Sequence, residues 1–146
     1  MTLKTVLMAL LLSVLMQPAP AHQASAADTP VAPAQLPTED VAQIRNIIVG
    51  QLDAFKSDDA EKAFSFAAPN IRKIFRTAEI FLHMVRKSYQ SVYRPRPFEF
   101  RAIQRIDGKI VQPLAVKGPS GVAETALYIM EPQSDGSWKI GACIMA

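Results

Sequence analysis

The period of the hydrophobic pattern changes at Phe98, and this change constrains the fold more than any other feature of the sequence. Between residues 41 and 85 the apolar residues recur at spacings of three and four, the spacing of one face of an α-helix. From Phe98 onward they alternate with polar residues, which is typical of a half-buried strand. Pro95 and Pro97 separate the two parts because a proline cannot continue a helix. We therefore expect an α+β fold, with N-terminal helices packed on one face of an antiparallel sheet.

Three helices are expected before this change. Thr38 is placed to cap the first helix, Asp58 the second and Thr77 the third, since each precedes a helical apolar pattern. A short helical turn over residues 70–76 lies between the second and third helices. We expect its apolar residues, Ile74 among them, to point inward.

Four strands are expected after the change, separated by turns with Asp-Gly or Pro-Ser-Gly sequences. Pro113 falls inside the second of them and predicts either an edge strand or a bulge, because proline cannot donate to a sheet ladder. The four expected strands cover residues 98–102, 109–117, 122–131 and 138–144.

The N-terminus has the pattern of a secretory signal peptide. Lys4 precedes an apolar run over residues 6–16, which is about half of the roughly 20 residues that a membrane span requires. Ala19-Pro20-Ala21 and Ala24-Ser25-Ala26 both fit the small residues that precede a cleavage point. We expect a protein that is periplasmic or secreted after cleavage, with three parts. These are a signal peptide over 1–26, a flexible Pro- and Ala-rich tether over 27–37 and a single domain over 38–146.

Composition narrows the function classes. The 146 residues are enough for one domain, and an apolar fraction of 49% excludes a disordered chain. The single cysteine, Cys143, excludes a disulfide framework and a cysteine-rich metal site, and we expect it to be a buried, inert thiol. The sequence contains no phosphate-binding loop, no dinucleotide glycine pattern and no His-Glu-x-x-His motif. We expect no cofactor and no metal.

Basic residues are concentrated in one third of the chain. Nine lysines and arginines lie between residues 72 and 105, where only Glu79 and Glu99 oppose them. One interpretation is a surface for anions, such as lipid headgroups, an acidic protein or a small ligand, because arginine binds carboxylates and phosphates in a bidentate way. The other is that these residues pair with the acidic N-terminal third and that Arg94 and Arg96 brace the extended segment. An exported domain gives no reason to expect a nucleic-acid partner.

Several segments resemble one bacterial family, the domain of unknown function 4864. They are QLDAFKSDDAEKAFSFAAPNIRKIF, MVRKSY, VYRPRPFEF and GSWKIGACI, and the resemblance covers roughly residues 40 to 146. The order of elements also resembles the wider nuclear transport factor 2-like superfamily. That resemblance implies three helices closing over a strongly curved four-stranded sheet, with a cone between them that often holds a ligand. Enzymes of the superfamily use an Asp or an Asp-His pair in the cone, and neither is mapped onto this sequence.

Three hypotheses of function follow. The first is an exported, non-enzymatic module that binds a small molecule or a protein through the cone and an arginine-rich rim. The second is an isomerase or hydratase with a carboxylate buried in the cone, and the third is a structural homodimer. An open cavity without a buried Asp or Glu would favour binding over catalysis.

The residues expected at a ligand site are arginines of the rim and aromatic residues that could line a pocket. No residue is assigned a catalytic role. His83 is expected to face solvent, and the carboxylates of Asp53, Glu99 and Glu124 are each either solvated or buried in the cone. The candidate ligand-binding residues are Tyr93, Arg94, Arg96, Arg101, Tyr128 and Trp138.

Overall fold

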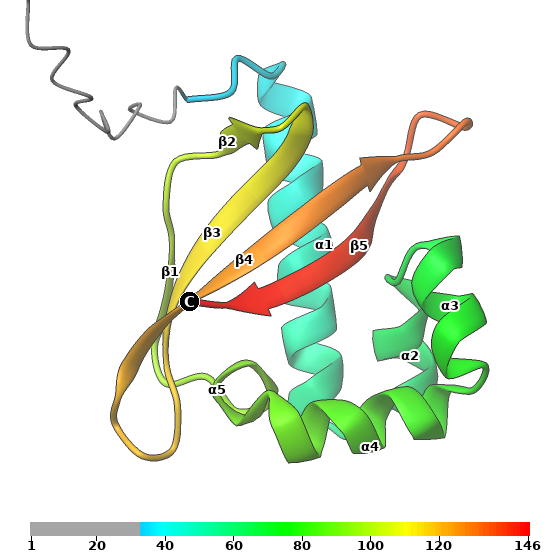
Figure 1. The fold of residues 1–146 in the computed structure, drawn as a ribbon, viewed down its shortest axis with the longest axis vertical. Coiled ribbons are helices and arrows are strands. Elements are labelled where there is room, and N and C mark those ends of the chain that lie inside the picture. The colour runs from blue at the N-terminus through cyan, green and yellow to red at the C-terminus, as the bar shows by residue number, and fades with distance from the viewer. Residues whose placement is uncertain (1–32) are drawn as a thin grey trace, which may run out of the picture.

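A computed structural model describes residues 33–146, as five helices followed by five strands (Figure 1). The expected α+β class is confirmed, since the helices precede a single antiparallel sheet. The expected signal peptide and residues 27–32 of the expected tether lie outside the described residues. Within residues 33–146, no helix has the length and apolar character to cross a bilayer. The elements are α1 (Thr38–Lys56), α2 (Ala60–Ser65), α3 (Pro69–Phe75), α4 (Ala78–Ser88), α5 (Gln90–Tyr93), β1 (Phe98–Phe100), β2 (Gln104–Ile106), β3 (Lys109–Lys117), β4 (Ala123–Pro132) and β5 (Trp138–Met145).

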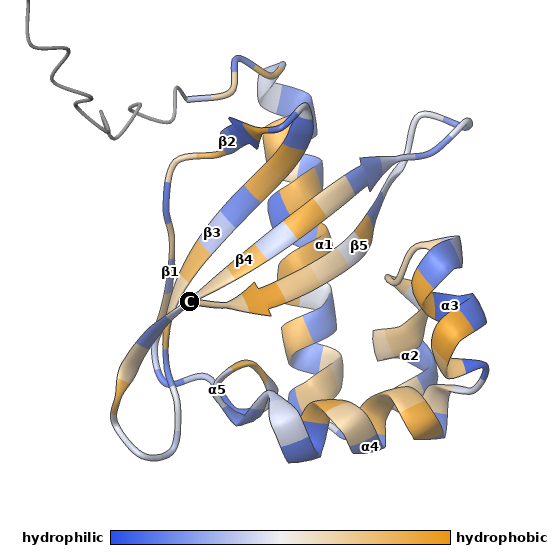
Figure 2. Cartoon of the chain, viewed as in Figure 1, coloured by the Kyte–Doolittle hydropathy of each residue, from blue (hydrophilic) through white to orange (hydrophobic). Residues whose placement is uncertain are grey.

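The long helix α1 lies across the sheet and buries the apolar stripe that the sequence predicted. Ile44, Ile48 and Leu52 are fully buried, and Phe55 is 1% exposed. Figure 2 shows this stripe as alternating orange and blue bands along α1 behind β3, β4 and β5. The stripe supplies the largest part of the contact between helices and sheet, and such burial stabilises by about 25 cal/mol per Å² of apolar surface.

The helix caps follow the sequence in part. Thr77 caps α4, because its Oγ1 accepts a hydrogen bond from the amide of Ile80 at 3.3 Å. The prediction for α1 was wrong, since Pro37 holds the cap position and no side chain caps that helix. The prediction for α2 was wrong by one residue: Asp59 accepts from the amide of Lys62, and Asp58 lies in the left-handed region at φ 56°.

The expected helical turn is confirmed as α3, but one of its inward residues is not buried. Ile71 and Phe75, four residues apart, are half-buried, whereas Ile74 is 68% exposed. On a helix of under two turns only one narrow line of residues faces the protein. Ile74 is turned about 60° away from Ile71 around the helix axis, and it therefore faces solvent.

The sheet has the order β1-β3-β4-β5, with β2 also paired to β3, and every pairing is antiparallel. The first expected strand is confirmed as β1, and β2 is an additional strand directly after it, so the sheet has one more strand than predicted. Pro113 lies opposite the gap between β1 and β2. It lies in β3 and has no amide hydrogen, and Gln112 Nε2 donates instead to the carbonyl oxygens of Arg101 and Pro113, both at 2.8 Å. The prediction of an edge strand was wrong, because β3 is paired on both sides, and the irregularity at Pro113 is an interruption of the ladder between β1 and β2.

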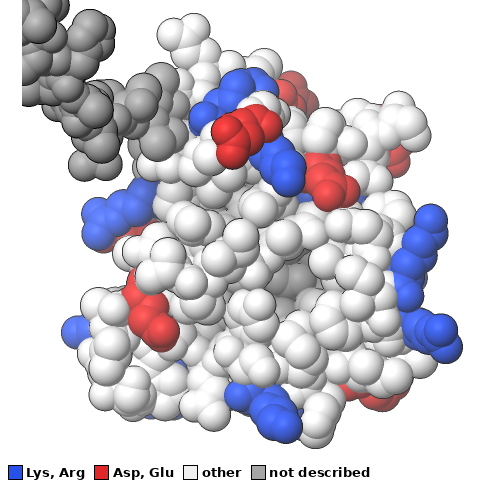
Figure 3. All heavy atoms as spheres, viewed as in Figure 1, with Lys and Arg blue, Asp and Glu red and all other residues white. Residues whose placement is uncertain are grey.

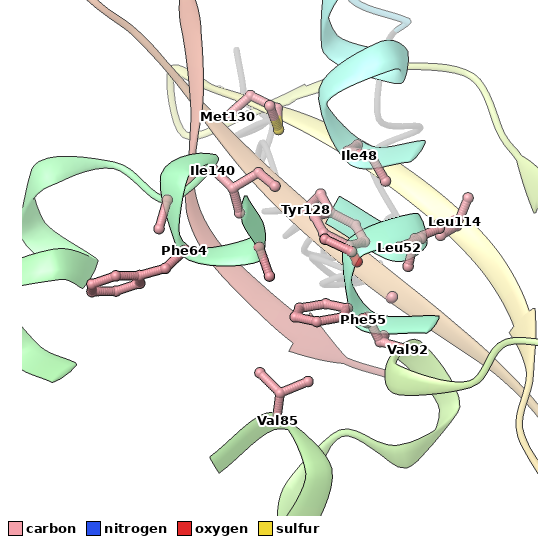
Figure 4. Close-up of a cluster of buried hydrophobic side chains, with 14 of the residues drawn as sticks. Ile48, Leu52, Phe55, Phe64, Val85, Val92, Leu114, Tyr128, Met130 and Ile140 are labelled. Atoms are coloured by element: carbon pink, nitrogen blue, oxygen red, sulfur yellow. The ribbon is translucent and has the colours of Figure 1, made fainter. Parts of the chain in front are cut away.

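The register places one face of the sheet against the helices. Ala126, Tyr128 and Met130 of β4 are buried on this face, and the residues between them are half-buried on the other. Figure 4 shows the Tyr128 ring reaching from β4 toward α1, where Leu52 and Phe55 project. The helices α4 and α5 pack beside α1 at one end of this layer (Figure 1).

Candidate functional site

The helices and the sheet do not close completely on one another. A cavity of about 260 Å³ remains between α1, α3, α4 and α5 on one side and β4 and β5 on the other. Figure 3 shows this face of the molecule hollowed near its centre, and the residues around the hollow are neither acidic nor basic. The cavity is lined by Gln51, Phe55, Ala67, Ile71, Phe75, Phe81, Met84, Val85, Tyr89, Val92, Tyr128, Ile140, Ala142 and Cys143.

The lining is apolar apart from four side chains. Among residues 33–146, no Lys, Arg, His, Asp or Glu lines the cavity. Gln51 is buried and donates from Nε2 to the carbonyl of Ala63 at 3.2 Å. The Tyr89 hydroxyl donates to the carbonyl of Cys143 at 3.3 Å. These two polar groups are therefore already hydrogen-bonded within the chain.

Tyr128 and Cys143 are the other two polar residues of the lining, and they face one another across β4 and β5. The Tyr128 hydroxyl is fully buried and has no hydrogen bond of standard geometry with any described residue, and its nearest polar neighbour is the Cys143 thiol. Burial raises the pKa of the Cys143 thiol to about 12 and the pKa of Tyr128 well above its ordinary value. Both groups are therefore protonated at neutral pH, and the thiol is not a nucleophile.

A second group of polar residues lies at the end of α1, where Tyr93 and Arg94 meet Asp58. Arg94 Nη2 lies 3.2 Å from Asp58 Oδ1, and Arg86 Nη2 lies 2.8 Å from the same oxygen. The Tyr93 hydroxyl also donates to Asp58, and this bond, with the two arginines, lowers the pKa of Asp58 to about 2. Arg94 further donates to the carbonyl of Phe55 in the last turn of α1 and stacks on the Tyr93 ring, 3.9 Å from its centroid. We call Asp58, Arg86, Tyr93 and Arg94 the Asp58 cluster.

The Asp58 cluster is outside the cavity lining, and its charges are paired with one another. It favours the interpretation in which part of the basic segment pairs with the acidic N-terminal third. It also joins the end of α1 to α4 and α5, because its members come from all three regions of the chain.

The other predicted ligand-binding residues are dispersed over the molecule. Arg101 pairs with Glu99 at 3.1 Å on the exposed side of β1, and Arg96 is exposed and forms no side-chain hydrogen bond with a described residue. Trp138 is buried at the start of β5 and donates from Nε1 to Asp40 at 3.2 Å. Of the six predicted residues, the structure places only Tyr128 in the cavity.

The titratable residues that the sequence singled out do not line the cavity either. His83 is exposed on α4, as predicted. Asp53 is exposed on α1 beside Lys56, and Glu124 accepts a hydrogen bond from Ser91 near the start of β4. Among residues 33–146, no group of three or more His, Cys, Asp or Glu residues is arranged to hold a metal ion.

Sequence reasoning missed most of the lining. Phe81, Met84 and Val85 carry the apolar periodicity of α4, which predicted only that they form the apolar side of that helix. The periodicity identifies the inward face of a helix, but it does not show whether that face meets its neighbours closely. No sequence signal distinguishes a core residue from a residue at the wall of a cavity.

Comparison with known proteins identifies the family. The family model described as domain of unknown function DUF4864 matches residues 37–146, from the residue before α1 through the end of β5. Neither the curated proteins nor the solved structures gave a match. The matched segment holds every described helix and strand as well as the whole lining of the cavity, and it covers most of the sequence. The chain therefore belongs to the DUF4864 family.

Proposed function

We propose that this DUF4864 protein is an exported module that binds a small, mostly apolar molecule in the cavity between its helices and its sheet. The observation that carries the proposal is the cavity itself, with about 260 Å³ of space inside an apolar wall. Native protein interiors are packed about as densely as organic crystals and contain few voids larger than a water molecule. A space of this size is therefore a candidate for a ligand site.

The chemistry of the wall favours binding over catalysis. An isomerase or hydratase needs a group that takes and returns a proton, and its usual source is a carboxylate or a histidine in a water-poor site. The described wall offers only a protonated thiol, two tyrosine hydroxyls and an amide. The Asp58 cluster is separate from the cavity, and its two arginines are paired with Asp58. The proposal therefore rests on the cavity rather than on an arginine-rich rim.

Two features of the sequence support the wider setting of this proposal. The N-terminal pattern is that of a secretory signal, which would bring the domain to the periplasm or the medium. The order of helices and antiparallel strands resembles the nuclear transport factor 2-like superfamily, in which the space between the helices and the curved sheet often holds a ligand.

A cavity-filling variant tests the proposal. Ala142 lies in the wall on β5, and Ala142→Phe places a ring in the cavity. Tetralin, an uncharged bicyclic hydrocarbon, serves as the probe, and the methyl resonance of Met84 in the wall reports its binding. We expect saturable binding to the natural chain and a loss of at least tenfold in affinity for Ala142→Phe.

The matched control is Ala102→Phe, at an exposed alanine between β1 and β2 outside the cavity wall. It adds the same ring and should leave the affinity for tetralin within twofold of the natural value. Fluorescence of the buried Trp138 checks that both variants are folded. If tetralin does not bind the natural chain, or if it binds a folded Ala142→Phe equally well, the cavity is not the site.

A further inference from the structure

We propose that the ligand is uncharged and carries an acceptor oxygen, such as a ketone, ester or ether oxygen, which receives a hydrogen bond from the hydroxyl of Tyr128. This inference rests on the proposed function and specifies the chemical class of the molecule in the cavity. It is drawn from three properties of the wall, which are its one unpaired donor, its lack of charge and its size.

The Tyr128 hydroxyl is the one hydroxyl of the described wall without a hydrogen bond. The hydroxyl of Tyr89 is occupied by the carbonyl of Cys143, and the amide of Gln51 donates to the carbonyl of Ala63. Tyr128 by contrast is fully buried in the middle of β4, with the wall of the cavity around it. Its cross-strand neighbour Cys143 presents only a thiol, which is a weak acceptor that lies close enough to influence the pKa of Tyr128, but no hydrogen bond of standard geometry joins the two.

A buried hydroxyl group is unfavourable unless an acceptor receives its hydrogen bond. Most buried polar groups in proteins are hydrogen-bonded, and an exception requires an explanation. Burial also raises the pKa of Tyr128, so the group keeps its proton and remains a donor at neutral pH. An oxygen of a bound ligand that accepts from Tyr128 would supply the missing hydrogen bond.

The wall excludes charged ligands. A carboxylate or an ammonium group that leaves water requires a partner of opposite charge, and the described wall contains none. Arg86 and Arg94, which could pair with a carboxylate, form ion pairs with Asp58 outside the cavity. The ligand is therefore neutral.

The size of the cavity sets the size of the probe. An engineered apolar cavity of about 150 Å³ holds one benzene molecule. The present cavity, at about 260 Å³, is larger and suits a molecule with two fused rings. Tetralin and 1-tetralone share this skeleton and differ in a single carbonyl oxygen, so together they isolate the proposed hydrogen bond.

The test compares the two probes on three proteins, which are the natural chain, Tyr128→Phe and Tyr93→Phe. On the natural chain we expect 1-tetralone to bind about three- to tenfold more tightly than tetralin, the range of one net hydrogen bond. Tyr128→Phe should abolish this preference and keep the binding of tetralin. Tyr93→Phe is the matched control, because its hydroxyl bonds to Asp58 outside the cavity, and it should keep the preference.

Two further measurements make the inference easier to refute. Urea unfolding of the ligand-free proteins should show Tyr128→Phe to be at least as stable as the natural chain, because the lost hydroxyl had no partner. The anion 1-naphthoate should bind at least tenfold more weakly than 1-tetralone. Equal affinity for the naphthoate would overturn the claim that the ligand is uncharged.

The outcomes separate this inference from the proposed function. If tetralin binds and Tyr128→Phe leaves the preference for 1-tetralone intact, the cavity is a ligand site but Tyr128 does not select the ligand. If tetralone has no advantage on the natural chain, the inference is also wrong. If neither probe binds, the proposed function fails and this inference fails with it.

Discussion

Cys143 is a residue of the cavity wall whose ionisation depends on the packing around it. Its pKa is about 12 in the folded chain against an ordinary value of 9.0, because the thiolate would be buried among apolar side chains. The unfolded chain therefore loses its proton at a lower pH than the folded chain does. Folding stability falls as the pH rises through this window, and it is unaffected below it.

The loss of stability with rising pH gives a prediction for Cys143. Between pH 9 and 10 the titration of Cys143 should lower the free energy of unfolding by about 1 kcal/mol, before Tyr128 contributes. Urea unfolding of the natural chain and of Cys143→Ala, at both pH values, measures this difference. Cys143→Ala changes stability at pH 7 as well, so the slope with pH is the readout. An identical slope in the two proteins would show that the thiol is not buried as described.

At the scale of elements, the Asp58 cluster holds the end of α1 against α4 and α5. Arg94 contributes most of the contacts, since its guanidinium bonds to the Phe55 carbonyl and to Asp58 and covers the Tyr93 ring. Arg96, two residues later, is exposed and forms no side-chain hydrogen bond with a described residue. The two arginines were equivalent candidates in the sequence, and the structure gives them different surroundings.

Arg94 and Arg96 serve as a test position and its matched control. Arg94→Ala should lower the free energy of unfolding by about 1–3 kcal/mol, because it leaves the Phe55 carbonyl without its side-chain donor and removes one of the three donors to Asp58. Arg96→Ala should change it by less than about 0.5 kcal/mol. Urea unfolding at neutral pH measures both, and equal effects of the two substitutions would contradict the assigned role of Arg94.

The elements also show how far the sequence predicts this fold. The change of period at Phe98 and the cap at Thr77 depend on local physics, and both predictions were confirmed. The gap between β1 and β2 lies opposite Pro113, where the side chain of Gln112 takes the place of the missing amide, which is a contact between strands. The exposure of Ile74 depends on which line of a short helix meets the sheet. Such tertiary contacts cannot be derived from spacing along the chain.

At the scale of the whole molecule, the proposed function depends on a space between layers rather than on a motif. Tyr128 was predicted at a ligand site from its type alone, and the structure places it in the cavity wall. Tyr93 and Trp138 were predicted at the site on the same ground, but Tyr93 lies in the Asp58 cluster and Trp138 lies beside Asp40. The difference follows from their elements, because Tyr128 lies in the middle of β4 on the face toward α1, whereas Tyr93 ends α5 and Trp138 begins β5.

The central claim is that the space between α1, α4 and β5 is open and apolar, and xenon tests it most directly. Xenon enters apolar cavities without any specific chemistry, and an engineered cavity of about 150 Å³ binds it. Crystals of the chain under xenon pressure should show at least one xenon atom among Phe81, Val85 and Ile140 in the cavity wall. Ala142→Phe should displace it. A crystal in which these side chains close the space and no xenon binds there would contradict the account.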